Sequence, residues 1–459
     1  MISAPNPQRL LNGSRLYYLL LITLFFGLSS CGGTKKTAQD DTVMAPGRNP
    51  IEAKKKTTRA QELDTIYWRE IDRLAEYEKT IEDLDLDKRP FYNVALLYPF
   101  GLVNNNLDDA NKAVSNLGRI TNYYAGTLMA LETLEQEDIS LQVSVYDAES
   151  GDFNLKLQQC NNADVIIGPK DRGQLASTAQ YGKNNEIPVV SPWLSSTKVT
   201  SDNPYYVQLN PSLKNHMNKI VEDVKDNYEN DQVFLLGRKN RKDRGMMNYI
   251  QQVADGDEDL PGQFEELYLE EDSLLLGEYA YQEVFFEDKT TVFILPNWSF
   301  VDDENFVYNA VRKLAGEKGL NKVVLYGMPI LIESNKITFE HYSNLNMRIC
   351  RTSYLNRGSV EVNEFRQNYF DKYQDFPSED VFEGYDMMMF VGRSLKNYGK
   401  KFQYFLDTYE ASLYQTEFEV LKVFKPGDDD SFDNIQYFQN NHLYILEFKD
   451  NYFTSRSDE

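Results

Sequence analysis

A group of hydroxyl residues follows one short apolar run of this chain and could hold a small anion. Ser195, Ser196 and Thr197 come shortly after the turn Ser191-Pro192. Hydroxyl groups placed in this way can donate hydrogen bonds to an anion, together with the backbone N–H groups at a helix start. The alternative is that one of them caps a helix and the others face water. The residue types alone leave both interpretations open.

A basic turn is the second candidate for anion binding. Residues 237–245 hold five basic residues among nine, in a chain with a net charge of −23. Arg238 in this turn could bind a carboxylate or phosphate through its fork of donors. Lys170 and Arg172, which follow another apolar run, would add to a locally positive site that focuses an anionic ligand. Alternatively, the turn begins a helix and its charges pair with acidic neighbours.

Two tryptophans also stand at turns. Trp193 follows Pro192, and Trp298 follows Pro296 after one intervening residue. Their large flat rings would suit the side chain of an amino acid or the face of a sugar. Packing of the turns themselves is the alternative.

Enzyme chemistry is not indicated. The chain has none of the motifs G-x-S-x-G, H-E-x-x-H and G-x-x-x-x-G-K-[ST]. Its three histidines, His216, His341 and His442, each lie more than four residues from any other histidine or cysteine. A zinc site is therefore not expected. The sequence predicts a protein that is not an enzyme and that needs no cofactor or metal.

The elements that must position these residues form an alternating pattern. Continuous apolar runs, separated by helical patterns, predict strands at Val94–Tyr98, Leu141–Tyr146, Asp164–Ile167, Ile187–Val190, Val233–Leu236, Thr291–Leu295 and Val323–Tyr326. Such runs are typical of parallel sheets covered by helices on both faces, so the fold class is α/β. Ligands of open α/β sheets lie beyond the carboxyl ends of the strands, where the candidate residues stand. The last forty residues differ, with antiparallel strands predicted at Glu417–Phe424 and His442–Phe448.

Composition narrows the class of partner. The chain has 71 acidic and 48 basic residues, so nucleic acid is not an expected partner. Its 459 residues exceed one hydrophobic core and indicate two lobes. Cys160 and Cys350 are expected to be buried thiols rather than a disulfide.

The N-terminal segment indicates export. Arg9 and Arg15 precede the apolar run Leu16–Leu28, which is a pattern typical of a secretory signal. Leu28-Ser29-Ser30-Cys31 resembles the bacterial lipobox, and this resemblance implies lipidation of Cys31. The predicted segments are a signal peptide at 1–30, a flexible lipid tether at 31–60 and an amphipathic helix at 61–88.

Six segments in order resemble the type 1 periplasmic-binding fold of branched-chain amino-acid binding proteins. They are V-A-L-L-Y-P-F (94–100), Y-Y-A-G-T-L-M-A-L (123–131), D-V-I-I-G-P (164–169), I-P-V-V-S-P (187–192), Y-Y-V-Q-L-N-P (205–211) and F-E-G-Y-D-M-M-M-F (382–390). The chain looks closest to a Bacteroidetes lipoprotein branch that often carries LysM repeats and is related to lipoprotein activators of penicillin-binding proteins.

The resemblance implies two lobes joined by three crossings, near Tyr205–Asn210 and Ile337–Cys350 for the first two. The expected N-terminal lobe spans 91–208 with 340–410, and the expected C-terminal lobe spans 209–339 with 411–459. Glu383-Gly384-Tyr385-Asp386 matches the family's G-Y-D segment at the start of a core helix, and we interpret it as structural. The chain departs from the family at the loop after Gly168-Pro169, which lacks the usual hydroxyls, and at Arg238, where a tyrosine turn is common.

Two functions follow from the resemblance. The first is binding of a small solute, an amino acid or other anionic ligand, in the cleft between the lobes, as in ABC transporter substrate-binding proteins. The alternative is a cell-envelope scaffold or regulator of peptidoglycan synthesis that acts by protein–protein contact. Gly32-Gly33 lacks the aspartate that retains many lipoproteins in the inner membrane, so we expect the outer membrane, facing the periplasm.

Overall fold

The computed structural model describes residues 86–101, 110–256, 263–275, 279–408, 410–425 and 434–456, with side chains of α3 described from Leu117 onward. The predicted signal peptide, the tether and all but the last residues of the amphipathic helix lie outside these ranges. Within the described ranges, no helix combines the length and the apolar character needed to cross a membrane.

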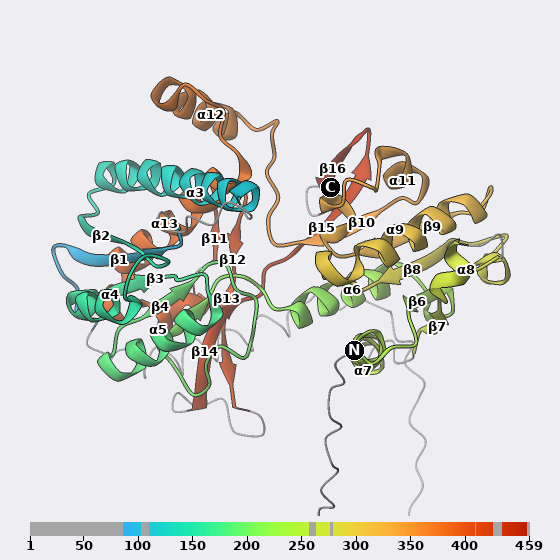
Figure 1. The fold of residues 1–459 in the computed structure, drawn as a ribbon, viewed down its shortest axis with the longest axis horizontal. Helices are drawn as coiled ribbons and strands as arrows, with labels where there is room; N and C mark the ends of the chain where they lie inside the picture. The colour runs from blue at the N-terminus through green and yellow to red at the C-terminus, as the bar shows by residue number, and fades with distance from the viewer. Residues whose placement is uncertain are drawn as a thin grey trace, which may run out of the picture. The chain divides into compact units, whose positions relative to one another are not determined.

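The first sheet has seven strands in the order β13-β14-β5-β4-β3-β1-β2 (Figure 1). All neighbouring strands are parallel except β13 and β14. The strands are β1 (Tyr92–Tyr98), β2 (Leu141–Asp147), β3 (Val165–Ile167), β4 (Val189–Ser191), β5 (Tyr206–Gln208), β13 (Val420–Phe424) and β14 (Ile435–Asn440). The helices of this lobe are α3 (Ala110–Gln136), α4 (Phe153–Gln159), α5 (Arg172–Asn185), α12 (Val360–Tyr373) and α13 (Glu379–Tyr398), with the 3-10 segment η5 (Gly399–Thr408).

Helices cover both faces of this sheet, as the continuous apolar strands predict. Val94, Leu96 and Tyr98 of β1 are buried against the side that carries α3 and α13. Ala95 and Leu97 are buried in a second cluster with residues of α4 and α5. Successive side chains of a strand point to opposite faces, so the run Val94–Tyr98 of β1 is apolar at every position.

The second sheet also has seven strands, in the order β16-β15-β10-β9-β8-β6-β7. They are β6 (Val233–Gly237), β7 (Glu265–Tyr268), β8 (Thr291–Leu295), β9 (Val323–Gly327), β10 (Arg348–Arg351), β15 (Tyr444–Lys449) and β16 (Tyr452–Ser455). The helices around it are α6 (Leu213–Asn227), α7 (Arg241–Asp255), α8 (Glu271–Leu275), α9 (Phe300–Glu317), α10 (Ile330–Glu333) and α11 (Phe339–Asn344). Cys350 of β10 is a buried free thiol, and so is Cys160 of the first lobe, as expected.

Strand pairing corrects the expected lobe boundaries in two places. β10 was expected in the first lobe but pairs with β9 and β15 in the second sheet. β13 and β14 were expected in the second lobe but pair with each other and with β5 in the first sheet. The pairing of β14 with β5 joins segments more than 200 residues apart, such as Phe438 and Val207, and the pairing of β10 with β15 joins segments about 100 residues apart, so a local pattern along the chain does not reveal them. Within the described residues the chain passes between the sheets after β5, after β10 and after β14, which gives the three implied crossings.

Candidate functional site

A cavity of about 330 Å³ lies at the carboxyl ends of β3, β4 and β5, where an open α/β sheet is expected to bind ligands. It is also lined by residues of α3, α13, the crossing after β10, the loop around β12 (Glu417–Phe418) and the end of α10. The lining residues used below are Arg119, Tyr123, Lys170, Trp193, Glu333, Arg351, Ser353, Glu379, Asp380, Glu383, Gln415 and Thr416.

Aromatic rings form one wall of this cavity. The Trp193 ring lies 5.1 Å from the Tyr123 ring and 5.4 Å from the Tyr98 ring, measured between centroids. Tyr98 is anchored through its hydroxyl, 3.1 Å from the Thr127 hydroxyl. The hydroxyl of Tyr123 is buried and has no hydrogen-bond partner among the described residues. This wall therefore offers an apolar aromatic surface to a ligand, together with the Tyr123 hydroxyl as a hydrogen-bonding group.

Charged side chains of both signs line the rest of the cavity. Arg119 pairs with Asp380 at 3.0 Å, and Arg351 pairs with Glu379 at 3.3 Å. Two ion pairs thus neutralise four of the lining charges.

Three charged lining residues remain outside these pairs: Lys170, Glu333 and Glu383. Among the described residues, neither the Lys170 ammonium nor the Glu383 carboxyl has a hydrogen bond or an ion pair. Burial raises the pKa of Glu383 to about 7, with a further rise from Asp380 and an opposing effect of Arg119, Lys170 and Arg351. An ammonium group placed beside Glu383 would favour its ionised form.

Two of the predicted site residues, Lys170 and Trp193, line this cavity. Arg172 is exposed and donates to the Lys198 backbone carbonyl at 3.2 Å. Ser195, Ser196 and Thr197 lie in the loop after β4, outside the cavity lining. None of the three hydroxyls caps a helix, because the next helix, α6, begins after its N-cap Ser212, and the Ser196 hydroxyl instead accepts from the Lys198 backbone N–H at 3.4 Å.

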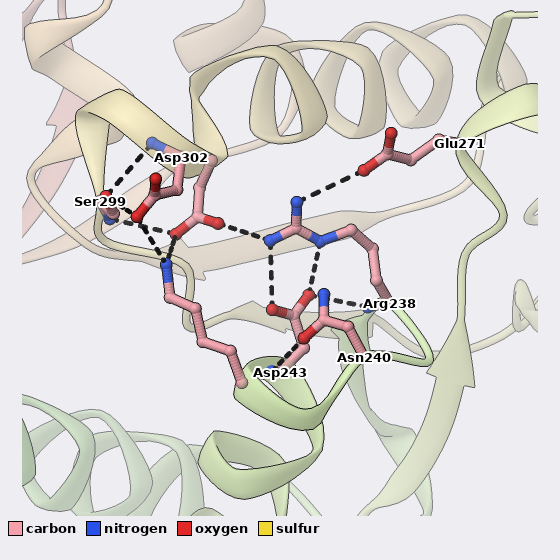
Figure 2. A network of polar contacts seen from close by, with 8 residues as sticks. Arg238, Asn240, Asp243, Glu271, Ser299 and Asp302 are labelled. Atoms are coloured by element: carbon pink, nitrogen blue, oxygen red, sulfur yellow. Dashed lines mark hydrogen bonds and ion pairs between the residues drawn. The ribbon is translucent and has the colours of Figure 1, made fainter. Parts of the chain in front are cut away.

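The contacts of Arg238 match the second interpretation of the basic turn, in which its charges pair with acidic neighbours (Figure 2). Its guanidinium donates to Asp243 at 2.8 and 3.1 Å and to Asp303 at 2.5 Å, and both carboxylates are fully buried. Glu271 accepts a further, longer bond at 3.3 Å. These ion pairs hold the pKa of Asp243 and of Asp303 below the usual value, against the effect of burial. The Arg238 charge is therefore already balanced by side chains of its own lobe.

Trp298 lies apart from the cavity lining. Its side chain is 49% exposed, and the Lys242 ammonium stands 5.3 Å from its ring centroid. Lys242 itself donates to Asp303 at 2.7 Å. The two prolyl turns thus place one tryptophan in the cavity and the other on the surface.

Several lining residues were not predicted as site residues. Arg119 and Tyr123 come from α3, and Glu383 comes from α13, whereas the prediction considered only turns after strands. The segment Glu383-Gly384-Tyr385-Asp386 lies on this helix, but it was interpreted as structural, so Glu383 was not predicted as a site residue. Among the described residues, no group of histidine, cysteine, aspartate and glutamate side chains is arranged to hold a metal ion.

Comparison with known proteins agrees with this architecture. Residues 112–260 match the family model described as the receptor family ligand binding region. No curated protein matches the sequence significantly.

Solved structures resemble about four fifths of this chain at low sequence identity. A putative branched-chain amino acid ABC transporter from Rhodospirillum rubrum has a TM-score of 0.55 and 11% identity, over 80% of this chain and 99% of that chain. An ABC-type branched-chain amino acid transporter from Rhodopseudomonas palustris has a TM-score of 0.51 and 13% identity, over 79% and 95%. LpoA from Haemophilus influenzae has a TM-score of 0.51 and 10% identity, over 81% of this chain and 59% of that chain. The two mostly parallel sheets, their three crossings and these similarities show that the chain has the two-lobed type 1 periplasmic-binding fold.

Proposed function

We propose that this chain binds a small solute with both a carboxylate and an amino group, such as an amino acid, in the cavity at the carboxyl ends of the first sheet. One observation carries the proposal: Lys170 and Glu383 line the same cavity, and neither has an ion-pair partner among the described residues. A zwitterionic ligand would give each of them a partner of opposite charge. Trp193 and Tyr123 would pack against the ligand's side chain.

The sequence also supports a cellular location for this protein. The apolar run Leu16–Leu28 followed by Cys31 favours export and attachment of a lipid to Cys31. Two or more acyl chains, at about 0.8 kcal/mol per buried methylene, are enough for stable anchoring. We therefore infer a lipid-anchored protein of the cell envelope that faces the periplasm from the outer membrane.

Thermal unfolding tests the solute proposal. The chain without its signal peptide and with Cys31→Ser would be screened against amino acids, short peptides, muropeptides and anionic metabolites. A ligand at 100 times its Kd stabilises the folded state by about 2.7 kcal/mol, which shifts the Tm by a few degrees. We expect a shift with a zwitterionic amino acid that is lost in Lys170→Ala and in Glu383→Gln.

Lys198→Ala is the matched control, because Lys198 is an exposed lysine outside the cavity lining. The expected result is an unchanged ligand-induced shift. A panel without any hit, on a protein that unfolds cooperatively, would contradict solute binding.

A protein-binding role in the envelope is the second candidate, with one surface feature in its favour. Trp298, Phe300 and Val301 are 49%, 47% and 92% exposed and stand almost consecutively at the start of α9. Adjacent exposed apolar side chains often mark contacts with other proteins. A photo-crosslinking residue at Val301 should capture a single envelope protein if this role is correct, whereas one at the equally exposed Leu320 should not.

A further inference from the structure

Asp386 of α13 is a fully buried carboxyl with an unusual set of partners. It accepts hydrogen bonds from three consecutive backbone N–H groups, those of Tyr414 at 3.1 Å, Gln415 at 2.9 Å and Thr416 at 3.0 Å. No arginine or lysine pairs with it among the described residues. Backbone N–H donors therefore provide most of the stabilisation of its charge.

The loop that Asp386 holds belongs to the cavity wall. Gln415 and Thr416 both line the cavity. The Gln415 side-chain amide also donates to the Glu379 backbone carbonyl at 3.1 Å, at the start of the same helix as Asp386.

The same loop holds the crossing that follows β10. The Tyr354 backbone N–H donates to the Gln415 carbonyl at 2.8 Å. Tyr354 directly follows Ser353, and Arg351, Thr352 and Ser353 of this crossing line the cavity. A continuous set of hydrogen bonds therefore runs from Asp386 through Gln415 to the crossing.

We propose that Asp386 is a positioning residue of the cavity: by holding the backbone of residues 414–416, it fixes the position of Gln415 and Thr416 and of the crossing segment 351–354. That the cavity binds a ligand rests on the proposed function, whereas the positioning of the loop by Asp386 is independent of it. Loss of the carboxylate would release the cavity wall and the crossing together, while leaving the two sheets intact.

Among the described residues, the titratable groups that face Asp386 are the tyrosines Tyr123 of α3, Tyr385 of α13 and Tyr414 of the loop. Burial raises the pKa of Asp386 to about 7, and the three N–H donors act against this rise. Protonation turns one acceptor oxygen into a donor. The hold on the loop is therefore expected to weaken as the pH falls below about 7.

Hydrogen–deuterium exchange of the whole chain, without any ligand, tests the positioning. In Asp386→Asn an amide NH₂ faces the N–H donors, so we expect the protection factors of residues 414–416 and of Tyr354 to fall about tenfold, the size expected for a lost hydrogen bond. In the wild-type chain the same amides should lose protection between pH 8 and pH 6, and this pH dependence should disappear in the variant. Unchanged protection in Asp386→Asn would overturn the proposal, and a wild-type profile that stays flat over this range would overturn its pH dependence.

Asp303→Asn is the matched control. Asp303 is equally buried and also accepts from a backbone N–H, that of Ser299 at 3.1 Å, but it lies in the second lobe. This variant should lower global stability and leave the exchange of residues 414–416 and Tyr354 at the wild-type level. If Asp386→Asn does not fold, Asp386→Ser, which also removes the carboxylate, takes its place in the same exchange measurement. None of these measurements involves a solute, so they can fail or succeed independently of the ligand screen.

Discussion

Gly384 of α13 lies directly against the backbone of Tyr123 in α3. A Cβ atom at position 384 would stand 1.9 Å from the Tyr123 carbonyl oxygen. The contact is reciprocal, because a Cβ at Gly126 would stand 1.8 Å from the Val381 carbonyl oxygen. The two helices thus pack backbone to backbone, and this close approach brings Tyr123 and Glu383 to the same cavity.

Gly384→Ala should therefore destabilise the protein. A methyl group at this position forces α3 and α13 apart, and overpacking of this kind typically costs about 1–3 kcal/mol. Urea unfolding measures the loss. Gly118→Ala in α3 is the control, since its Cβ would meet no atom within 4 Å, and alanine is the better helix former. Equal stability of the two variants would contradict the described helix contact.

Arg238→Ala should destabilise the second lobe without affecting solute binding. The change leaves the buried carboxylates of Asp243 and Asp303 with less positive charge, and breaking such a buried pair typically costs about 3–5 kcal/mol. Denaturant unfolding should show this loss. Arg241→Ala, at an exposed arginine of the same turn, should have little effect. A stable Arg238→Ala protein that no longer binds a solute would instead support the anion site expected from the sequence.

Glu383 should make stability fall as the pH rises. Its pKa in the folded chain is raised from the ordinary 4.5 to about 7, so the folded state binds a proton more tightly than the unfolded state does. At about 1.4 kcal/mol per pKa unit, this group reduces the free energy of unfolding by up to about 3 kcal/mol between pH 4.5 and pH 7. Glu383→Gln should therefore be more stable than the wild-type chain at pH 8, and the difference should disappear at pH 4.5. The exposed residue Glu135 of α3 provides the control variant Glu135→Gln, for which we expect no such difference.

Tryptophan fluorescence should report a ligand through Trp193. This ring lines the cavity, whereas Trp298 lies outside it. A solute found in the thermal screen should change the emission of the wild-type chain and of Trp298→Phe. The change should be lost in Trp193→Phe. A response that depends on Trp298 instead would place the ligand on the second lobe.

The sequence by itself determined the fold class and most of the strands. Continuous apolar runs such as 94–98 and 291–295 are buried on both faces when layers of helices cover both sides of the sheet. These two runs coincide closely with β1 and β8. The turns after β3 and β4 also predicted the edge of the first sheet at which the cavity lies, because Lys170 and Trp193 in these turns line it.

Only the tertiary structure decided which charged side chains remain without an ion-pair partner and can bind a ligand. A basic residue in a sequence can face a ligand or an acidic neighbour, and the pairing of Arg238 with Asp303, 65 residues away, could not be inferred from the turn in which Arg238 stands. The same holds for Glu383, which reaches the cavity because two glycines allow α3 and α13 to touch. Apolar periodicity is a local property of the chain, whereas the balance of charge in a site depends on contacts between segments that only folding brings together.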